Sequence, residues 1–124
     1  MPDWSEWWDL VAAAGGMRTA GTTLKSTTGW REDRREGRPG TDDFGFSALP
    51  GGLTTPWGSP FWGIGVFAEW WSATEDVDEG KGSATYAIST VIYGFRDDNS
   101  VYLGRSRKTN RYSVRCVEGA ADRP

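Results

Sequence analysis

Side chains that could perform acid–base or nucleophilic chemistry are few in this chain of 124 residues, which has no histidine and a single cysteine. Acid–base catalysis would therefore need paired carboxylates, and the pairs in turn-like sequence are Asp42-Asp43 and Asp97-Asp98. Neighbouring side chains on an extended backbone point in opposite directions, so neither pair can converge on one substrate atom. Such pairs are more typical of turns. We therefore expect no catalytic residues and a protein that is not an enzyme.

Metal binding has equally little support in the sequence. A structural zinc site needs about four Cys or His ligands, and Cys116 is the only such residue. Because it lies between Val114 and Val117, we expect it to be a small buried side chain in an apolar strand. The acidic stretch Glu75–Glu79 lacks the regular ligand spacing of a calcium loop, so we expect a solvated loop there. The sequence thus predicts neither a metal nor any other cofactor.

The charges of the chain are unevenly distributed around a net charge of −3. A mildly acidic chain lacks the broad basic field that phosphate backbones require, so we expect no nucleic-acid partner. One segment is acidic and another is basic; their charged residues are Glu69, Glu75, Asp76, Asp78 and Glu79, and Arg105, Arg107, Lys108, Arg111 and Arg115. Two solvated loops that offset each other are the simpler interpretation, and a basic strip that meets an anionic ligand is the alternative.

The first regular element is a helix that should run from about residue 4 to Ala14. Asp3 and Glu6 form a capping box at its start, and Gly15-Gly16 ends it. Its apolar side chains recur at helical spacing and predict one core-facing stripe: Trp4, Trp7, Trp8, Val11 and Ala14. A second, short helical turn fits Ala20–Lys25, and we expect Leu24 and Trp30 to be buried anchors nearby.

Strands are expected in the second half of the chain. Residues 66–74, 84–95 and 101–107 have strand-like composition, and 111–118 is expected to pair with 101–107 as a hairpin. Trp70 and Trp71 should both fill the core. The pattern predicts an α+β fold, with one or two short helices packed on a small, mainly antiparallel sheet between long irregular loops. We expect a single domain over residues 1–118 and a frayed tail over 119–124. No membrane span is visible.

Several motifs occur together in one order and spacing. They are Glu6-Trp7, Gly15-Gly16, Ala20-Gly21-Thr22, Leu24-Lys25-Ser26, Gly29-Trp30, the run from Gly40 to Gly52 (GTDDFGFSALPGG), the run from Trp70 to Glu75 (WWSATE), and the run from Ser113 to Val117 (SVRCV). This succession, from the first residues to about Val117, resembles the Fibrobacter succinogenes major paralogous domain. Arg111 departs from the pattern, since a glycine is usual there. The strand that usually precedes the helix is reduced to Met1-Pro2-Asp3, so we expect a truncated first strand.

The resemblance implies a fold and a function. The family is similar to the formylglycine-generating-enzyme branch of the C-type lectin fold, which variable proteins of diversity-generating retroelements also use. It therefore implies a C-type lectin-like domain, secreted or displayed at a bacterial cell surface, that binds a ligand without chemistry. A formylglycine-generating oxidase needs paired thiols, which this chain lacks. The signatures of calcium-type lectins, Glu-Pro-Asn and Trp-Asn-Asp, are also absent.

In that fold, the C-terminal strands and loops present the binding face, and Tyr and Arg offer large contact area with a polar tip. Transferred to this chain, the resemblance implies these ligand-binding residues: Tyr86, Ser89, Thr90, Arg96, Asp98, Tyr102, Arg105, Arg107 and Asn110. The target would be a protein or another cell-surface molecule.

Two further functions fit the sequence. In a carbohydrate-binding module, Trp57, Trp62 or Trp71 would stack on sugar rings. In an assembly domain, the shortened first strand would leave an open sheet edge for a neighbouring copy, giving a homo-oligomer.

Overall fold

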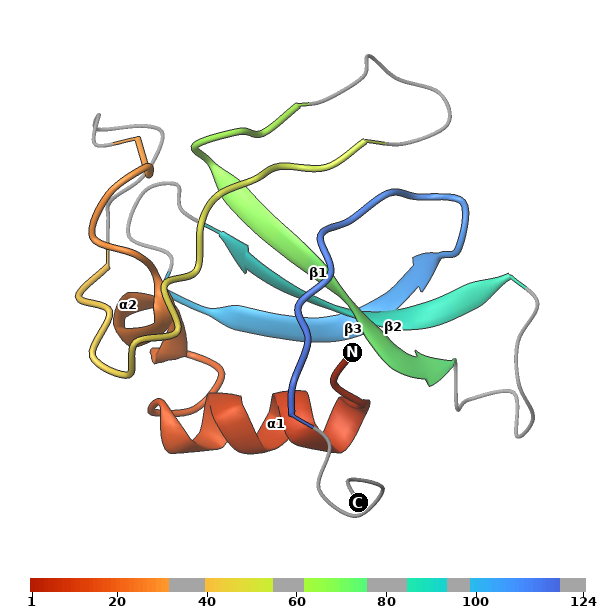
Figure 1. The fold of residues 1–124 in the computed structure, drawn as a ribbon, viewed down its shortest axis with the longest axis horizontal. Coiled ribbons are helices and arrows are strands. Elements are labelled where there is room, and N and C mark those ends of the chain that lie inside the picture. Colours follow the sequence, from red (N-terminus) through yellow and green to blue (C-terminus); the bar gives the residue numbers. More distant parts are fainter. Residues whose placement is uncertain (32–39, 55–61, 76–84, 94–98, 119–124) are drawn as a thin grey trace.

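The structure is a computed structural model that describes residues 1–31, 40–54, 62–75, 85–93 and 99–118. Two helices and a three-stranded antiparallel sheet make up the regular elements of these residues (Figure 1). This confirms the α+β class. Neither described helix is long and apolar enough to cross a membrane.

Helix α1 spans Trp4–Ala13 and begins with the predicted capping box. The Asp3 carboxylate accepts a hydrogen bond from the backbone N–H of Glu6 at 2.8 Å, and the Glu6 carboxylate accepts one from Asp3 at 2.9 Å. The predicted stripe is only partly correct. Trp7 and Val11 are buried, whereas Trp4 and Trp8 are 45% and 40% exposed and stack on each other. The predicted stripe is wider than the part of the helix that the sheet covers, so the side chains along one edge of the stripe stay exposed to solvent.

Helix α2 spans Ala20–Leu24 and confirms the predicted short helix. Leu24 and Trp30 are both buried, as expected, and the Trp30 indole N–H donates to the backbone oxygen of Ala48 at 2.9 Å. Helix α2 lies next to Asn99, two residues before the strand that begins at Val101. The backbone N–H of Gly21 donates a hydrogen bond to the backbone oxygen of Asn99 at 2.8 Å.

The sheet has the order β1-β2-β3, with β1 at Phe67–Glu75, β2 at Tyr86–Tyr93 and β3 at Val101–Arg107. All three strands lie where the sequence predicts strands. Both pairs are antiparallel, with Trp70 opposite Thr90 in the first pair. Between Trp71 and Glu75 the register of β1 shifts, so Trp71 lies opposite Ser89 but Glu75 lies opposite Ala87. This β-bulge re-aims the side chains at the end of β1.

The predicted hairpin between residues 101–107 and 111–118 is wrong. Strand β3 pairs with β2, and after a turn at 108–110 the chain runs to the far edge of β1. There Ser113 N donates to Glu69 O at 3.0 Å and Trp71 N donates to Ser113 O at 3.1 Å. Only isolated bridges form, because Ser113 contacts β1 at a single point before the segment leaves the sheet.

The outer edge of β1 is therefore covered by three separate segments of the same chain. Gly52 N donates to Phe67 O at 2.9 Å, Ser113 pairs beside Glu69 and Trp71, and Ala73 N donates to Pro2 O at 2.8 Å. The short residue run before α1 thus contributes to the sheet edge directly. This edge of the described sheet is occupied by the chain itself.

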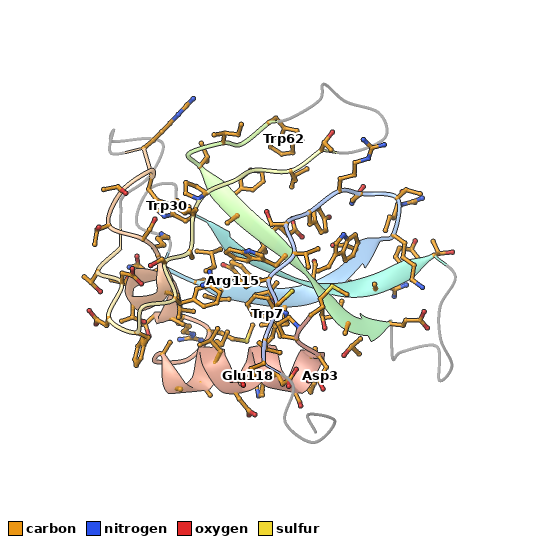
Figure 2. All side chains as sticks on the ribbon, viewed as in Figure 1. Asp3, Trp7, Trp30, Trp62, Arg115 and Glu118 are labelled. Carbon is orange, nitrogen blue, oxygen red and sulfur yellow. The ribbon has the colours of Figure 1, made fainter. Side chains whose placement is uncertain are left out.

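The core lies between α1 and one face of the sheet. Trp7 and Trp70 have ring centroids 5.7 Å apart, and Phe46 meets both rings edge-on, at 6.1 Å and 5.9 Å. Figure 2 shows Trp7 between α1 and the sheet. Ile92 and Val101 complete this cluster from β2 and β3. Aromatic rings thus supply much of the buried area, as the tryptophan-rich composition predicts.

Candidate functional site

The two faces of the sheet differ in character, because successive strand residues point to opposite sides. We call the side that carries Trp70, Thr90 and Ile92 the helix face, since α1 packs on it. We call the side that carries Trp71 and Ser89 the pocket face. The prediction that both tryptophans fill the core is correct for Trp70, which is 4% exposed, but Trp71 is only half-buried.

A pocket of about 370 Å³ opens on the pocket face at the β-bulge, and we call it the bulge pocket. The pocket is lined by residues of β1 and β2, of the turn after β3, and of the segments before α1 and after that turn. These residues are Met1, Trp71, Ser72, Ala73, Thr74, Glu75, Ala87, Lys108 and Val114. Its size lies within the range of small-molecule sites, about 300–1,000 Å³. The bulge creates the hollow, because the extra residues of β1 have no partners on β2.

The lining of the bulge pocket combines an aromatic side chain with an ion pair. Trp71 lines the pocket, and its ring packs on that of Tyr112, with the centroids 4.6 Å apart and an angle of 37° between the planes. Lys108 and Glu75 also line the pocket, and Lys108 Nζ lies 2.7 Å from Glu75 Oε1. Apolar walls with a few convergent polar groups are typical of a binding site. The pocket can hold an apolar or ring-shaped group whose polar substituents reach Lys108 or Glu75.

A buried polar network centred on Glu69 includes Tyr112, the residue that packs on Trp71. Ser89 Oγ donates to Glu69 Oε1 at 2.9 Å and lies 2.8 Å from Ser106 Oγ. Tyr112 also hydrogen-bonds to the Glu69 carboxyl group and accepts from Asn110 Nδ2 at 2.8 Å. The network ties the ring of Tyr112 to the middle of the sheet and, through the ring contact, helps to position Trp71 at the pocket.

Burial raises the pKa of Glu69 above its ordinary value of 4.5, and the hydrogen bonds from Ser89, Ser106 and Tyr112 offset only part of this effect. Burial likewise raises the pKa of Tyr112 above 10.0; the hydrogen bonds with Ser106 and Asn110 offset part of this effect, and the charge of Glu69 adds to it. Folding therefore favours the protonated form of the Glu69 carboxyl group.

This proton makes stability depend on pH in a defined direction. Because the folded-state pKa is the higher one, the Glu69 contribution to stability is fully present below pH 4.5 and is lost as pH rises through the raised pKa. Glu69→Gln cannot titrate, so its free energy of unfolding should gain on that of the wild type as pH rises through this window. Urea unfolding of both proteins between pH 4 and pH 8 measures the difference. A difference that stays constant with pH would contradict the burial of an ionisable Glu69.

The predicted binding residues lie on both faces of the sheet, and not all of them are exposed. Asn110 and the 43%-exposed Tyr102 lie on the pocket face. Ser89 is also on that face but is buried at 3% in the Glu69 network, so it is a supporting residue and not a surface contact. Thr90 is buried at 1% on the helix face, and its hydroxyl oxygen has no hydrogen-bond partner among the described residues. The prediction of an exposed side chain is wrong for both.

Tyr86, Arg105 and Arg107 come together at the end of the helix face. The Arg105 guanidinium carbon lies 4.3 Å from the centre of the Tyr86 ring, and that of Arg107 lies 6.0 Å away. Pairing of Tyr86 with Arg107 and of Ile88 with Arg105 produces this arrangement. Arg96 and Asp98, the remaining predicted residues, lie outside the described residues.

Other residues of the site could not be recognised from the sequence. Glu69, Tyr112, Ala87 and Lys108 were not among the predicted binding residues, and the bulge that gathers them has no glycine or proline to mark it. Cys116, expected to be buried, is exposed, because residues 114–118 leave the sheet. It lines a second pocket of about 240 Å³ between α1, Phe46 and Arg115. The described residues contain no group of three or more acidic or cysteine side chains that could hold a metal ion.

Comparison with known proteins places the chain in a family. No curated protein and no solved structure matches it. The family model of the Fibrobacter succinogenes major domain matches residues 1–118, which is nearly the whole chain and confirms the resemblance found in the sequence. The described residues of the match contain both helices, all three strands and the bulge pocket. This chain therefore belongs to the Fibrobacter succinogenes major domain family.

Proposed function

We propose that the protein is a non-catalytic binding module whose ligand enters the bulge pocket. The observation that carries the proposal is the pocket itself: a hollow at the end of the sheet whose lining includes the indole of Trp71 and the ion pair of Lys108 and Glu75. A side chain of a protein target fits these walls, with its apolar part against Trp71 and a polar end at Lys108 or Glu75. Nothing in this arrangement requires the ligand to be altered.

The wider setting of this proposal rests on the resemblance of the sequence. We propose that the α+β fold is C-type lectin-like, and that the domain acts outside the cell or at a cell surface. The pocket is formed partly by residues after β3, where variable proteins of the same fold type present their binding residues. This favours recognition of a surface target, with sequence diversification of the C-terminal region as one source of its specificity.

Carbohydrate binding is the second candidate, and the position of Trp71 favours it. A half-buried indole at a pocket wall, with a carboxylate and an ammonium group nearby, could stack on a sugar ring and hydrogen-bond to its hydroxyl groups. Trp62, also considered for this role, is 52% exposed but meets Phe67 edge-on at 4.9 Å, away from the bulge pocket. Trp57 lies outside the described residues.

Arrays of neutral glycans and of surface-protein peptides, probed with wild-type protein, would separate the two candidates. We expect Trp71→Ala to weaken every specific signal by about tenfold or more, since an aromatic anchor in a pocket typically contributes at least that much. Trp62→Ala is the matched control, because it removes an exposed indole outside the pocket. Signals on peptides alone favour a protein target and signals on glycans alone favour carbohydrate. Loss of binding in Trp62→Ala with full binding in Trp71→Ala would contradict the pocket assignment.

A further inference from the structure

The second pocket, of about 240 Å³, lies beside α1, and we call it the helix pocket. Its lining comes from α1, from the segments before α1 and after β3, and from the loop that carries Phe46. The main lining residues are Glu6, Trp7, Leu10, Phe46, Arg115 and Val117. No lining residue is shared with the bulge pocket, so the two pockets are separate.

Contacts with the core and with the sheet hold the walls of the helix pocket in place. Phe46 meets Trp7 edge-on, with ring centroids 6.1 Å apart, and so joins the aromatic core. The segment that carries Arg115 is attached to the outer edge of β1 two residues earlier, where Ser113 N donates to Glu69 O at 3.0 Å. Walls fixed by such contacts need little ordering when a ligand binds.

Two hydrogen-bond donors of this lining have no acceptor within the described part of the chain. Arg115 is half-buried, and its guanidinium carbon lies 4.1 Å from the centre of the Phe46 ring. The guanidinium forms no ion pair or hydrogen bond with another described residue. The indole N–H of Trp7 is buried and also lacks a partner among those residues. Because buried polar groups nearly always have partners, these donors favour a ligand with acceptor oxygens.

The lining also includes a negative charge, that of Glu6. Its carboxylate accepts a hydrogen bond from Asp3 N at 2.9 Å, which holds the side chain at the start of α1. No ion pair joins Glu6 to Arg115, although both line the helix pocket. A ligand with a single charge would be attracted by one of these groups and repelled by the other. A ligand with one charge of each sign complements both.

We propose that the helix pocket binds a free α-amino acid with an apolar side chain. The ligand carboxylate pairs with Arg115, whose planar guanidinium can donate two parallel hydrogen bonds to it. The ammonium group pairs with Glu6, and the apolar side chain lies against Leu10 and Phe46. The pocket is smaller than the about 300–1,000 Å³ of drug-sized sites, which suits a ligand of this size.

A free amino acid fits these charges better than a peptide does, because either terminus of a peptide carries only one of them. The proposal does not depend on ligand binding at the bulge pocket.

Isothermal titration of wild-type protein with L-leucine tests the proposal. Isocaproate is leucine without its ammonium group, isoamylamine is leucine without its carboxylate, and glycine has both charges without the apolar side chain. We expect L-leucine to bind, and each of the three comparison compounds to bind at least about fivefold more weakly, since each lacks one of the contacts.

Charge-removing variants assign the two contacts. Arg115→Gln should weaken L-leucine binding by about tenfold or more, and the exposed Glu6→Gln by about two- to fivefold. Glutamine at position 6 can still complete the capping box of α1. The matched controls are Arg111→Gln and Asp9→Asn, which make the same charge changes at exposed positions outside the pocket and should leave binding intact. Thermal melting curves of the four variants show whether the fold is retained.

The single thiol of the chain gives an independent measurement on the wild-type protein. Cys116 is exposed and lines the helix pocket, so bound L-leucine should slow its alkylation by iodoacetamide in proportion to saturation. The proposal is overturned if L-leucine does not bind, if isocaproate binds as tightly, or if Arg115→Gln folds and binds like Arg111→Gln. An alkylation rate that stays the same at saturating L-leucine would place the bound amino acid elsewhere and overturn it as well.

Discussion

Replacing Trp70 with alanine will unfold the domain or come close to it, whereas the same change at the neighbouring Trp71 will leave it folded. Trp70 is 4% exposed and contacts Trp7 and Phe46 in the core. Truncating a buried tryptophan costs about 3–5 kcal/mol, because burial and ring contacts are lost and a cavity remains. Small domains have a total stability of about 5–15 kcal/mol, so this loss takes up much of it.

Trp71 points to the other face, where it is half-buried and stacks on Tyr112. Removing the Trp71 indole lowers the free energy of unfolding by about 0.5–1.5 kcal/mol for the lost ring contact. The loss of the part of the indole surface that is buried adds to this. Urea unfolding followed by far-ultraviolet circular dichroism compares the two variants under identical conditions. Equal losses of stability would show that both rings belong to the core and that Trp71 is not a pocket residue.

A second pair of neighbouring positions should respond in opposite ways: Gly52→Ala will destabilise the domain strongly, and Gly51→Ala will not. Gly52 has φ of +68°, and an added Cβ would lie 2.3 Å from Trp62 O. The left-handed backbone costs about 1–2 kcal/mol in any residue with a Cβ, and the backbone clash adds about 1–3 kcal/mol. The backbone N–H of Gly52 also donates the hydrogen bond to the backbone oxygen of Phe67 at the outer edge of β1.

Gly51 is the control, because its φ is not positive and an added Cβ would lie 3.5 Å from Ser113 Oγ, an ordinary contact. Alanine there restricts the unfolded chain and should be neutral or stabilising by up to about 1 kcal/mol. Thermal melts of the two variants and the wild type measure both effects. A Gly52→Ala variant that melts within a few degrees of wild type would mean that the edge segment is not tied to β1.

The local elements of this fold could be predicted from the sequence because their signals are local. The capping box at Asp3 and Glu6 and the glycine pair at Gly15-Gly16 define α1 within a residue or two. Strand composition likewise located β1, β2 and β3. The family resemblance was also evident, since many motifs recur in one order, and the family model confirms it.

The pairing of segments far apart in sequence could not be predicted in the same way. Residues 111–118 look like a strand that would pair with its neighbour, yet Ser113 pairs with β1. The strand with which such a segment pairs depends on which strand has an unpaired backbone edge. That the outer edge of β1 is available follows from the three-dimensional arrangement of the strands and not from the sequence. The exposure of Cys116 follows from the same error, because a residue outside the sheet has no strand to bury it.

The residues that line the candidate site could not be predicted from the sequence, because none of the predicted binding residues within the described part of the chain lines the bulge pocket. Arg105 and Arg107 meet Tyr86 on the other face, and a binding role for these residues stays a prediction. The alternation of β2 could not show which of its faces is covered, so Ser89 and Thr90 were assigned to the surface. The bulge between Trp71 and Glu75 has no sequence marker, and it is the feature that forms the pocket.

The most direct test of a binding role for the bulge pocket is a nuclear magnetic resonance titration of isotope-labelled protein with the strongest array ligand. We expect the Trp71 indole N–H and the backbone amides of Ala87 and Lys108 to shift in proportion to ligand bound, while the Trp7 and Trp70 indole signals stay in place. The ligand should be recovered chemically unchanged. Shifts confined to residues away from the pocket, or conversion of the ligand into a product, would contradict a binding module at this site.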